Sequence, residues 1–425
     1  MSISEMKDGV NGRLDESSIA QSSAYEPKRI FDQLDQLNPA QEQYALQFVD
    51  KLVEFAVQIG TSDVHLQPTR TKFEVRFRSN GVLERLGEFE KGTSTSIVSR
   101  VKVLSGLLTY ISDMPQEGRI IDPVPGVEVR VSTFPTLHGE RIALRFFGNS
   151  GSFTQLRELG HTPEVAEALL NSLDETSGAL MVTGPAGSGK STTLFACLRH
   201  LVDINRGNRC LMSLEDPIEV PIDGVSQSQV NLTSGFDLHT GLRSLLRQDP
   251  EVIMIGEIRD AVTAEIAIQA CLTGQLMMTT FHAENVGTTI SRLLDLGIDP
   301  YLIRSGINGI LSQRLLRKLC KSCCVETEDR SRFFGLPIDT ASIPKGCPNC
   351  NQTGYQGRIL VSEYLSIKDS SFVEHLLEKA DSREIYKRAV ESGMKSIWER
   401  ATELVRDKIT SPREVRRVLG VTMRI

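Results

Sequence analysis

The stretch that decides the fold reads Gly184-Pro185-Ala186-Gly187-Ser188-Gly189-Lys190-Ser191. The apolar run 180–182 leads into it as a strand, and residues 192–198, beginning with Thr192, lead out with helical spacing. In such a strand-loop-helix unit, backbone N–H groups and a helix N-terminus converge on phosphate oxygens. Lys190 would reach the β and γ phosphates, and the Ser191 hydroxyl would ligate Mg²⁺. The sequence therefore predicts a nucleoside triphosphate site.

The composition of the whole chain is that of an ordinary globular protein. Its 425 residues suggest about two or three domains. A hydrophobic content of 40%, a charged content of 24% and a net charge of −6 give no general attraction to nucleic acid. We expect neither a secretory signal nor a membrane-spanning segment, so the expected location is the cytosol, with any membrane role exerted through a partner.

Four of the eight cysteines form two closely spaced pairs. The pairs are Cys320-x2-Cys323 and Cys347-x2-Cys350, with residues 324–346 between them. Two such knuckles are typical of a tetrahedral four-cysteine zinc site, although four unrelated thiols are the alternative. In a cytosolic protein we do not expect disulfides. The sequence predicts a structural zinc ion.

The first third of the chain predicts a flexible tail followed by a small α+β domain. Residues 1–37 are polar and lack sustained periodicity, as in a tail. Residues 38–147 combine a helix with one apolar face and strands that alternate apolar and charged residues, with a hairpin turn at Asn80-Gly81. Arginines on these strands point away from the core, which composition alone would interpret as a solvated surface.

After an expected linker at 148–156, the segment 157–425 alternates strands and helices. Strands are expected near 179–183, 209–214, 252–255 and 276–280, which predicts a parallel sheet with helices on both faces. The zinc-binding insertion would occupy about 318–356. A mostly helical tail would close the chain.

Acidic residues follow two of the expected strands. Glu257 comes directly after the apolar run 252–255, where it could hold Mg²⁺ or its waters. Glu215, Asp216 and Glu219 follow 210–214 and form either a functional carboxylate cluster or an exposed acidic loop. His282 follows the run 276–281, and a lone histidine in this place is more often structural than catalytic.

These motifs, taken in order, resemble the secretion ATPases of type II secretion and type IV pilus assembly. The resemblance rests on 184–194, on Glu-Asp-Pro-Ile-Glu at 215–219, on 241–260 ending in Ile-Gly-Glu-Ile-Arg-Asp, and on Thr-Thr-Phe-His at 279–282. It extends upstream to Ser-Asp-Val-His at 62–65 and to Pro-Gln-Glu-Gly-Arg at 115–119. It implies a RecA-like P-loop domain preceded by a PAS-like domain.

The resemblance also implies roles for single residues. Arg130 and Arg145 match two arginines of the smaller domain that reach the nucleotide phosphates when the domains close, which replaces the solvated-surface interpretation for these two. Glu219 matches the catalytic glutamate of the aspartate-rich box, Glu257 the Walker B acid, and His282 the histidine-box residue. Gln275 stands where the family has a histidine, and an amide cannot take up a proton.

The favoured hypothesis is a Mg²⁺-dependent ATPase, hexameric by resemblance, that powers assembly of a type IV pilus or a type II secretion pseudopilus from the cytoplasmic side of the inner membrane. Its partner would be the inner-membrane platform protein. The paired cysteines favour assembly or secretion over retraction. One alternative is a retraction or DNA-transfer motor, for which the basic stretch 304–321 could be a nucleic-acid contact, although a helix surface facing solvent or another subunit is favoured. Another alternative is a non-catalytic nucleotide-binding scaffold.

Overall fold

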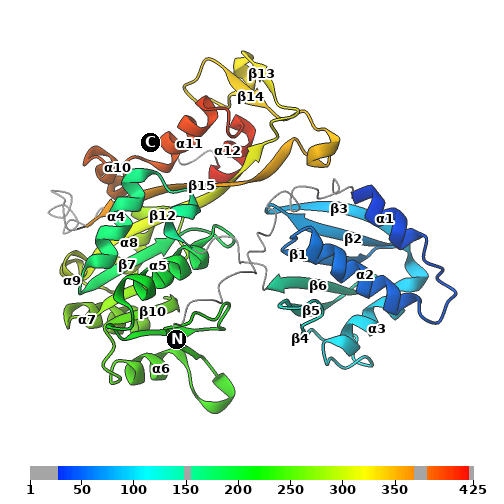
Figure 1. The fold of residues 1–425 in the computed structure, drawn as a ribbon, viewed down its shortest axis with the longest axis horizontal. Helices are drawn as coiled ribbons and strands as arrows, with labels where there is room; N and C mark the ends of the chain where they lie inside the picture. The colour runs from blue at the N-terminus through cyan, green and yellow to red at the C-terminus, as the bar shows by residue number, and fades with distance from the viewer. Residues whose placement is uncertain (1–26, 148–154, 368–380, 421–425) are drawn as a thin grey trace, which may run out of the picture.

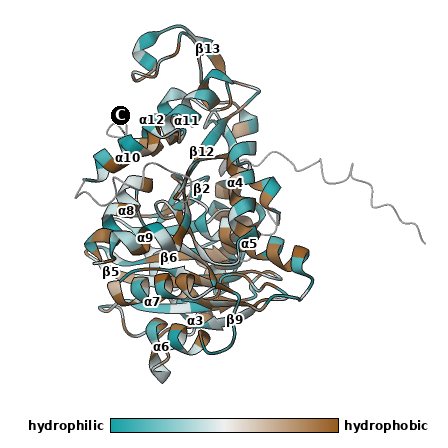
Figure 2. Cartoon of the chain, turned by 90° about the vertical axis from the view of Figure 1, so that its left-hand side faces the viewer, coloured by the Kyte–Doolittle hydropathy of each residue, from teal (hydrophilic) through white to brown (hydrophobic). Residues whose placement is uncertain are grey.

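The computed structural model of the chain describes residues 27–147, 155–367 and 381–420. Its strands form a six-stranded sheet in the first part of the chain, a seven-stranded sheet in the second, and a short two-stranded ribbon. Figure 1 shows the six-stranded sheet in blue and cyan and the seven-stranded sheet in green to orange. The helices in Figure 2 alternate between brown and teal, as elements with one apolar and one polar face do.

The six-stranded sheet is antiparallel throughout, in the order β3-β2-β1-β6-β5-β4. The turn predicted at Asn80-Gly81 joins β2 to β3, and both residues have positive φ (51° and 78°), as a two-residue hairpin requires. The strands are β1 (Asp63–Pro68), β2 (Lys72–Ser79), β3 (Val82–Glu90), β4 (Gln116–Ile121), β5 (Glu128–Thr136) and β6 (Gly139–Phe147).

Three helices cover one face of this sheet: α1 (Pro27–Asp35), α2 (Tyr44–Gln58) and α3 (Ser94–Leu104). The expectation of a flexible tail over 1–37 is wrong for residues 27–35, because Ile30 and Leu34, one helical turn apart, are buried in the core of the sheet. Residues 1–26 lie outside the described residues, as do 148–154 of the expected linker. The α+β character agrees with the sequence, and the finer PAS-like assignment stays a prediction.

The seven-stranded sheet has the order β15-β12-β7-β11-β10-β8-β9. All neighbours are parallel except the edge strand β15, which is antiparallel to β12. The four strands expected from sequence are β7, β8, β10 and β11, within two residues at each end. The strands are β7 (Gly178–Thr183), β8 (Leu211–Glu215), β9 (Ser226–Gln229), β10 (Val252–Glu257), β11 (Leu276–Phe281), β12 (Ile307–Leu319) and β15 (Tyr355–Ser366).

Helices cover both faces of this sheet, as predicted. Leu180 and Val182 of β7 belong to one buried cluster, whereas Met181 between them belongs to another. The first cluster includes α4 and α5, and the second includes α6 to α10, so the central strands β7, β10 and β11 are buried on both sides. The helices are α4 (Pro163–Asp174), α5 (Lys190–Asn205), α6 (Leu238–Leu245), α7 (Ala261–Leu272), α8 (Val286–Asp295), α9 (Pro300–Gly306) and α10 (Ser382–Glu391).

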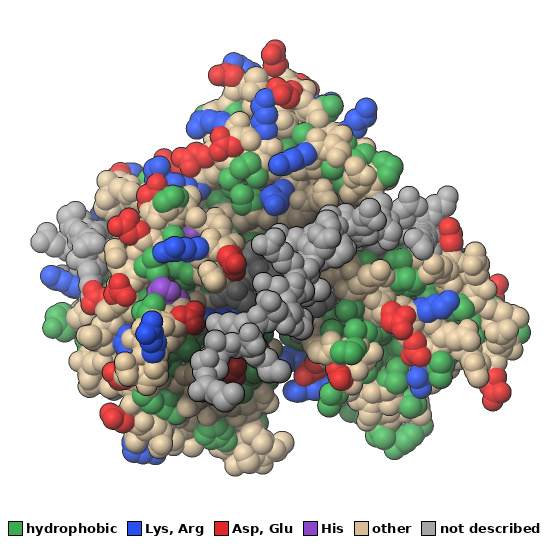
Figure 3. All heavy atoms as spheres, in the orientation of Figure 1, with side chains coloured by type: hydrophobic (Ala, Val, Ile, Leu, Met, Phe, Trp, Pro, Cys, Tyr) green, Lys and Arg blue, Asp and Glu red, His purple; other side chains and the backbone are tan. Residues whose placement is uncertain are grey.

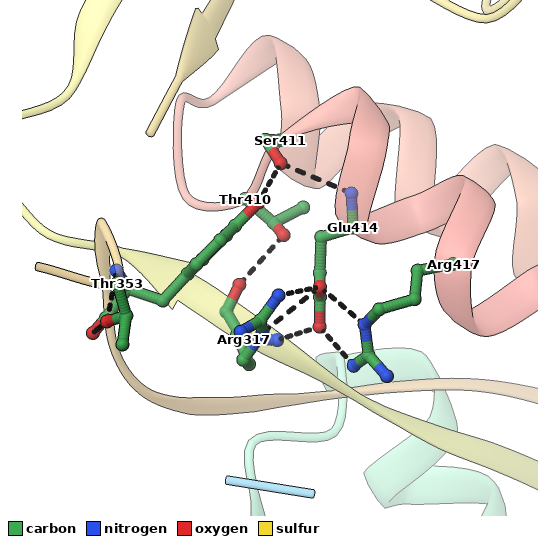
Figure 4. A network of polar contacts seen from close by, with 7 residues as sticks. Arg317, Thr353, Thr410, Ser411, Glu414 and Arg417 are labelled. Atoms are coloured by element: carbon green, nitrogen blue, oxygen red, sulfur yellow. Dashed lines mark hydrogen bonds and ion pairs between the residues drawn. The ribbon is translucent and has the colours of Figure 1, made fainter. Parts of the chain in front are cut away.

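The basic stretch 304–321 is not a helix surface. Most of it is β12, which lies between β7 and β15 and is buried along most of its length. Because Arg314 is 4% exposed, it has no solvent-facing charge to offer. Arg317 Nη2 donates a hydrogen bond to Oε2 of the buried Glu414 at 2.8 Å, as Figure 4 shows. The apolar positions that suggested helical spacing instead fill both faces of a central strand.

The connection from β12 to β15 contains both cysteine pairs. It holds the ribbon β13 (Val325–Thr327) and β14 (Ala341–Ile343) between the two cysteine pairs. The last helices, α11 (Ile397–Arg406) and α12 (Pro412–Leu419), pack with β12, β15 and β14 in a separate apolar cluster. The described residues 381–420 contain the three helices α10, α11 and α12.

Candidate active site

The phosphate-binding loop lies between β7 and α5, as its sequence requires. Gly184 has φ of +151°, and a Cβ there would lie 2.5 Å from the Ser188 Oγ, so no other residue fits. The Lys190 ammonium donates to the backbone carbonyls of Gly184 and Pro185, at 2.8 and 3.0 Å. The lysine is thus folded back over the loop, where its ammonium donates to backbone carbonyls.

Burial lowers the pKa of Lys190 to about 8, and the nearby charge of Arg314 adds to this effect, whereas Glu257 and Glu219 oppose it. The side chain is 8% exposed. A buried ammonium whose pKa is depressed gains from any anion that approaches it. The loop therefore favours a negatively charged ligand.

A cavity of about 460 Å³ opens above this loop at the carboxyl ends of the parallel strands. It brings together most of the residues expected from sequence. The predicted residues that line it are Ala186, Gly187, Lys190, Ser191, Glu215, Asp216, Glu219, Glu257 and His282. Because β7, β8, β10 and β11 run parallel, the residues that follow them meet at one edge.

The carboxylates of the cavity differ in their surroundings. Glu215 is 3% exposed and accepts hydrogen bonds from the Ser213 hydroxyl (2.6 Å) and the Gln227 amide (2.9 Å), so it is fixed in place. Asp216 and Glu219 lie in the exposed segment that follows. The cluster left open by the sequence is therefore one braced acid and two exposed acids on the same cavity wall.

Glu257 lines the same cavity as Lys190, and its carboxylate has two neighbouring side chains, Arg259 and His282. One of its oxygens pairs with Arg259, and the other lies 3.2 Å from His282 Nε2. Partial burial and the charge of Lys190 lower the pKa of His282, against the opposing effect of Glu257. His282 is therefore neutral at pH 7 and can exchange hydrogen bonds without adding charge.

Four of the charged or titratable residues that line the cavity were not predicted. Arg259 and Asp260 directly follow the Gly-Glu-Ile signature, so their position in the sequence could have identified them as residues of the site. Asp237 and His239 come from the start of α6, where no motif marks them. His239 Nε2 lies 2.9 Å from Asp260 Oδ1, which joins α6 to the N-terminus of α7 at the rim.

Arg130 and Arg145 do not line this cavity. They lie directly opposite each other on β5 and β6, within a row of cross-strand neighbours on the six-stranded sheet that we call the arginine row: Arg119, Arg130, Arg145, Asp63 and Arg78. Arg145 is 67% exposed in its side chain and donates to Asp63 at 2.9 Å. Like charges on facing strands repel one another. Two acids, Asp63 beside Arg145 and Arg78 and Glu128 beside Arg119 and Arg130, offset only part of the repulsion among the four arginines.

The two cysteine pairs meet in space and form the tetracysteine cluster. All four Sγ atoms lie within 4.8 Å of one another. Cys320 Sγ lies 3.8 Å from Cys347 Sγ, and Cys323 Sγ lies 3.7 Å from Cys350 Sγ. Four sulfurs bound at 2.3 Å around a tetrahedral ion would be about 3.8 Å apart. Backbone N–H groups of Cys347 and Gly354 donate to Cys350 Sγ. The donor set therefore fits zinc.

The loop, the parallel sheet and the cavity define a P-loop nucleotide-binding protein. The family described as "Type II/IV secretion system protein" matches residues 38–417, and the chain belongs to that family. The resemblance drawn from the motifs is thereby confirmed.

Relatives and solved structures agree with this assignment. The chain is 38% identical to the type II secretion system ATPase E of Vibrio cholerae over 381 residues, 88% of the chain and 75% of the relative. It is 36% identical to the type IV pilus assembly ATPase TfpB of Acinetobacter baylyi over 401 residues, 91% of the chain and 68% of the relative.

Two solved structures share its fold. The Legionella pneumophila ATPase DotB has a TM-score of 0.62 at 21% identity and covers 88% of the chain and 95% of its own length. The pilus retraction motor PilT with bound ADP has a TM-score of 0.56 at 20% identity, and the match covers 87% of this chain and 96% of the PilT chain. Among the described residues, no helix has the length and apolar character to cross a bilayer.

Proposed function

We propose that this chain hydrolyses ATP in a Mg²⁺-dependent reaction and uses the energy to power assembly of a type IV pilus or a type II secretion pseudopilus. The observation that carries the proposal is the cavity in which Lys190, Ser191, Glu219 and Glu257 converge. Phosphoryl transfer needs little covalent chemistry from a protein. It needs positioned cations, a metal site and a group that orients water, and this cavity provides residues of each kind.

The loop N–H groups and Lys190 would bind the β and γ phosphates, with Glu215 and Asp216 completing the binding wall. Ser191 and Glu257 would hold Mg²⁺, which when bound neutralises phosphate charge. Glu219, exposed in the cavity, would position or activate the attacking water. His282, neutral beside Glu257, would respond to changes at the γ phosphate through that carboxylate.

Arg130 and Arg145 would reach the phosphates when the two parts of the chain close. Support comes from the repulsion within the arginine row, which a bound polyphosphate would relieve. Acting only in the closed state, these arginines would stabilise charge that develops during transfer and would couple hydrolysis to movement.

We propose that the working form is a homo-oligomer, a hexamer by family resemblance, docked on an inner-membrane platform protein at the cytoplasmic side. Zinc in the tetracysteine cluster would be structural, because protein fills all four of its ligand positions. The relatives named for type II secretion and type IV pilus assembly support the proposed role in such a machine.

The alternatives are a retraction or DNA-transfer motor and a non-catalytic scaffold. For the DNA-transfer version, the contact suggested in the basic stretch loses its support, since Arg314 is buried and Arg317 is paired with Glu414. The face drawn in Figure 3 intersperses acidic and basic side chains outside the grey residues, so it offers no continuous basic track there. Turnover that is unchanged by added DNA would agree with a motor that does not act on nucleic acid.

The test is phosphate release by Lys190→Ala and Glu219→Gln proteins, with Lys387→Ala and Glu167→Gln as controls at exposed positions on α10 and α4. We expect both site variants to lose turnover by about 100-fold or more and both controls to match the wild type. Wild-type turnover in the site variants would refute the scheme. A wild-type protein that binds ATP but releases no phosphate, even with the platform protein present, would favour the scaffold.

A further inference from the structure

Strand β12 continues past the end of β7 and runs beside the phosphate-binding loop. The last register pair of the two strands is Ser312 with Thr183, after which β7 turns into the loop. Gln313 is the next residue of β12, and its side chain is fully buried. A polar amide in such a place must find partners within the protein.

Both ends of the Gln313 amide bond to the phosphate-binding unit. Its Nε2 donates to the Ser188 carbonyl at 2.9 Å, and its Oε1 accepts from the Thr193 hydroxyl at 2.9 Å. Ser188 belongs to the loop, and Thr193 belongs to the first turn of α5. One side chain therefore holds the loop and the helix that receive the phosphate in a fixed relation.

The loop also packs closely against this residue. A Cβ on Gly184 would lie 2.7 Å from the Gln313 carbonyl oxygen, and a Cβ on Gly189 would lie 3.2 Å from Gln313 Nε2. Two of the loop glycines are thus needed for the approach to Gln313 and not only for the turn. The phosphate-binding loop therefore packs directly against Gln313.

Gln313 is itself held by the residue that follows it. The Arg314 guanidinium donates to the Gln313 carbonyl at 2.9 Å and also to the carbonyl of Glu284. Glu284 stands two residues after His282, so the same dipeptide fixes the loop that carries the histidine. The backbone that carries the amide is therefore tied to the loop that carries His282.

We propose that Gln313 is a positioning residue that holds the phosphate-binding loop in its anion-binding conformation. This inference rests on the proposed nucleotide binding. Without the amide, the Ser188 carbonyl and the Thr193 hydroxyl lose their hydrogen bonds to Gln313. The loop must then become ordered when the nucleotide binds. Such ordering weakens nucleotide affinity, because the cost is taken from the binding free energy.

The experiment compares Gln313→Met, a variant of similar shape, with Thr193→Val, the double variant and Thr193→Ser. The matched control is Asn308→Leu, which removes another amide of β12 that donates to a carbonyl, that of Ser177 at the opposite end of β7. The measurements are the Kd of a fluorescent ATP analogue, kcat and KM for ATP, and the unfolding midpoint.

We expect Gln313→Met to raise the Kd about tenfold and Thr193→Val about threefold. The double variant should be no weaker than Gln313→Met alone, because the two residues share one hydrogen bond. Thr193→Ser should bind like the wild type, and Asn308→Leu should leave the Kd unchanged whatever it does to the unfolding midpoint.

A wild-type Kd in both Gln313→Met and Thr193→Val, or a double variant whose loss is the product of the single losses, would overturn the inference. The same follows if Asn308→Leu weakens binding as much as Gln313→Met, since the effect would then be general destabilisation. Should Gln313→Met not fold, Thr193→Val and Thr193→Ser decide the matter. A wild-type protein that does not bind the analogue would refute the proposed function instead.

Discussion

Glu414 joins the last helix to the central sheet, and its neutralisation should destabilise the C-terminal part of the chain selectively. The carboxylate is fully buried and accepts three hydrogen bonds from Arg317, whose backbone N–H, Nε and Nη2 donate at 2.8–3.1 Å. Arg417 adds two more donors at 2.6 and 2.8 Å. Figure 4 shows the two guanidinium groups converging on it.

The magnitude follows from burial. Removing one partner of a buried ion pair costs about 3–5 kcal/mol, because the other charge is left uncompensated. The Arg317 side chain is 14% exposed, so its interaction with Glu414 contributes fully to stability. The Arg417 side chain is 41% exposed, and water screens its interaction with Glu414. Glu414→Gln should therefore lower the local free energy of unfolding by about 3 kcal/mol.

The assay uses the single tryptophan of the chain, Trp398, which packs in the same apolar cluster as α12. Urea unfolding followed by its fluorescence reports on this part of the molecule. The control is Asp339→Asn, which removes an ion pair whose side chains are 81% and 92% exposed and should change stability by less than about 0.5 kcal/mol. A loss for Glu414→Gln no larger than that of the control would refute the reasoning.

The same site predicts a pH dependence. Burial by itself would raise the pKa of Glu414, but hydrogen bonds from Arg417 and Arg317 hold it below its unfolded value of 4.5. Because the folded pKa is the lower one, the stabilisation is present above pH 4.5 and is lost as the pH falls through the folded value. The stability difference between the wild type and Glu414→Gln should therefore shrink below about pH 4.5.

Three further outcomes test the proposed site. Because the pKa of Lys190 is lowered to about 8 and only the ammonium attracts phosphate, ATP affinity should be constant below pH 8 and fall about tenfold per pH unit above it. Lys190→Arg should abolish that fall in binding titrations, and an equal fall would contradict the assignment. Metal analysis should find about one zinc ion per chain, and Cys347→Ser should lose it and lower the urea midpoint reported by Trp398. Arg145→Gln should lower kcat about 100-fold with little change in ATP Kd, whereas Arg141→Gln on the same strand should leave both unchanged.

Much of the site could be predicted from sequence because its parts are local. The phosphate loop, the acid after β10 and the acids after β8 each follow an apolar run within a few residues, so their place at a strand end could be inferred without a fold. The parallel arrangement then carries them to one edge. The cysteine spacing likewise predicts a pair of knuckles, and the two knuckles meet as expected.

The misjudged segments were those in which partners distant in sequence decide the structure. Residues 27–35 look polar in isolation, yet they form a helix because the six-stranded sheet offers Ile30 and Leu34 an apolar surface. The basic stretch 304–321 has apolar positions compatible with a helix, but strands on both sides make it a strand.

The sequence by itself determined the ligand class and the chemistry, because a phosphate-binding loop and its acids are short-range features. The backbone conformation of the loop requires glycines at fixed positions, so the residue types reveal it. Tertiary structure alone decided which side chains support that chemistry. Gln313 lies beside the loop, and Arg119 lies in line with Arg130 and Arg145, only through the register of neighbouring strands. The register of β12 beside β7 depends on packing between segments far apart in the chain, and no pattern within either segment alone encodes it.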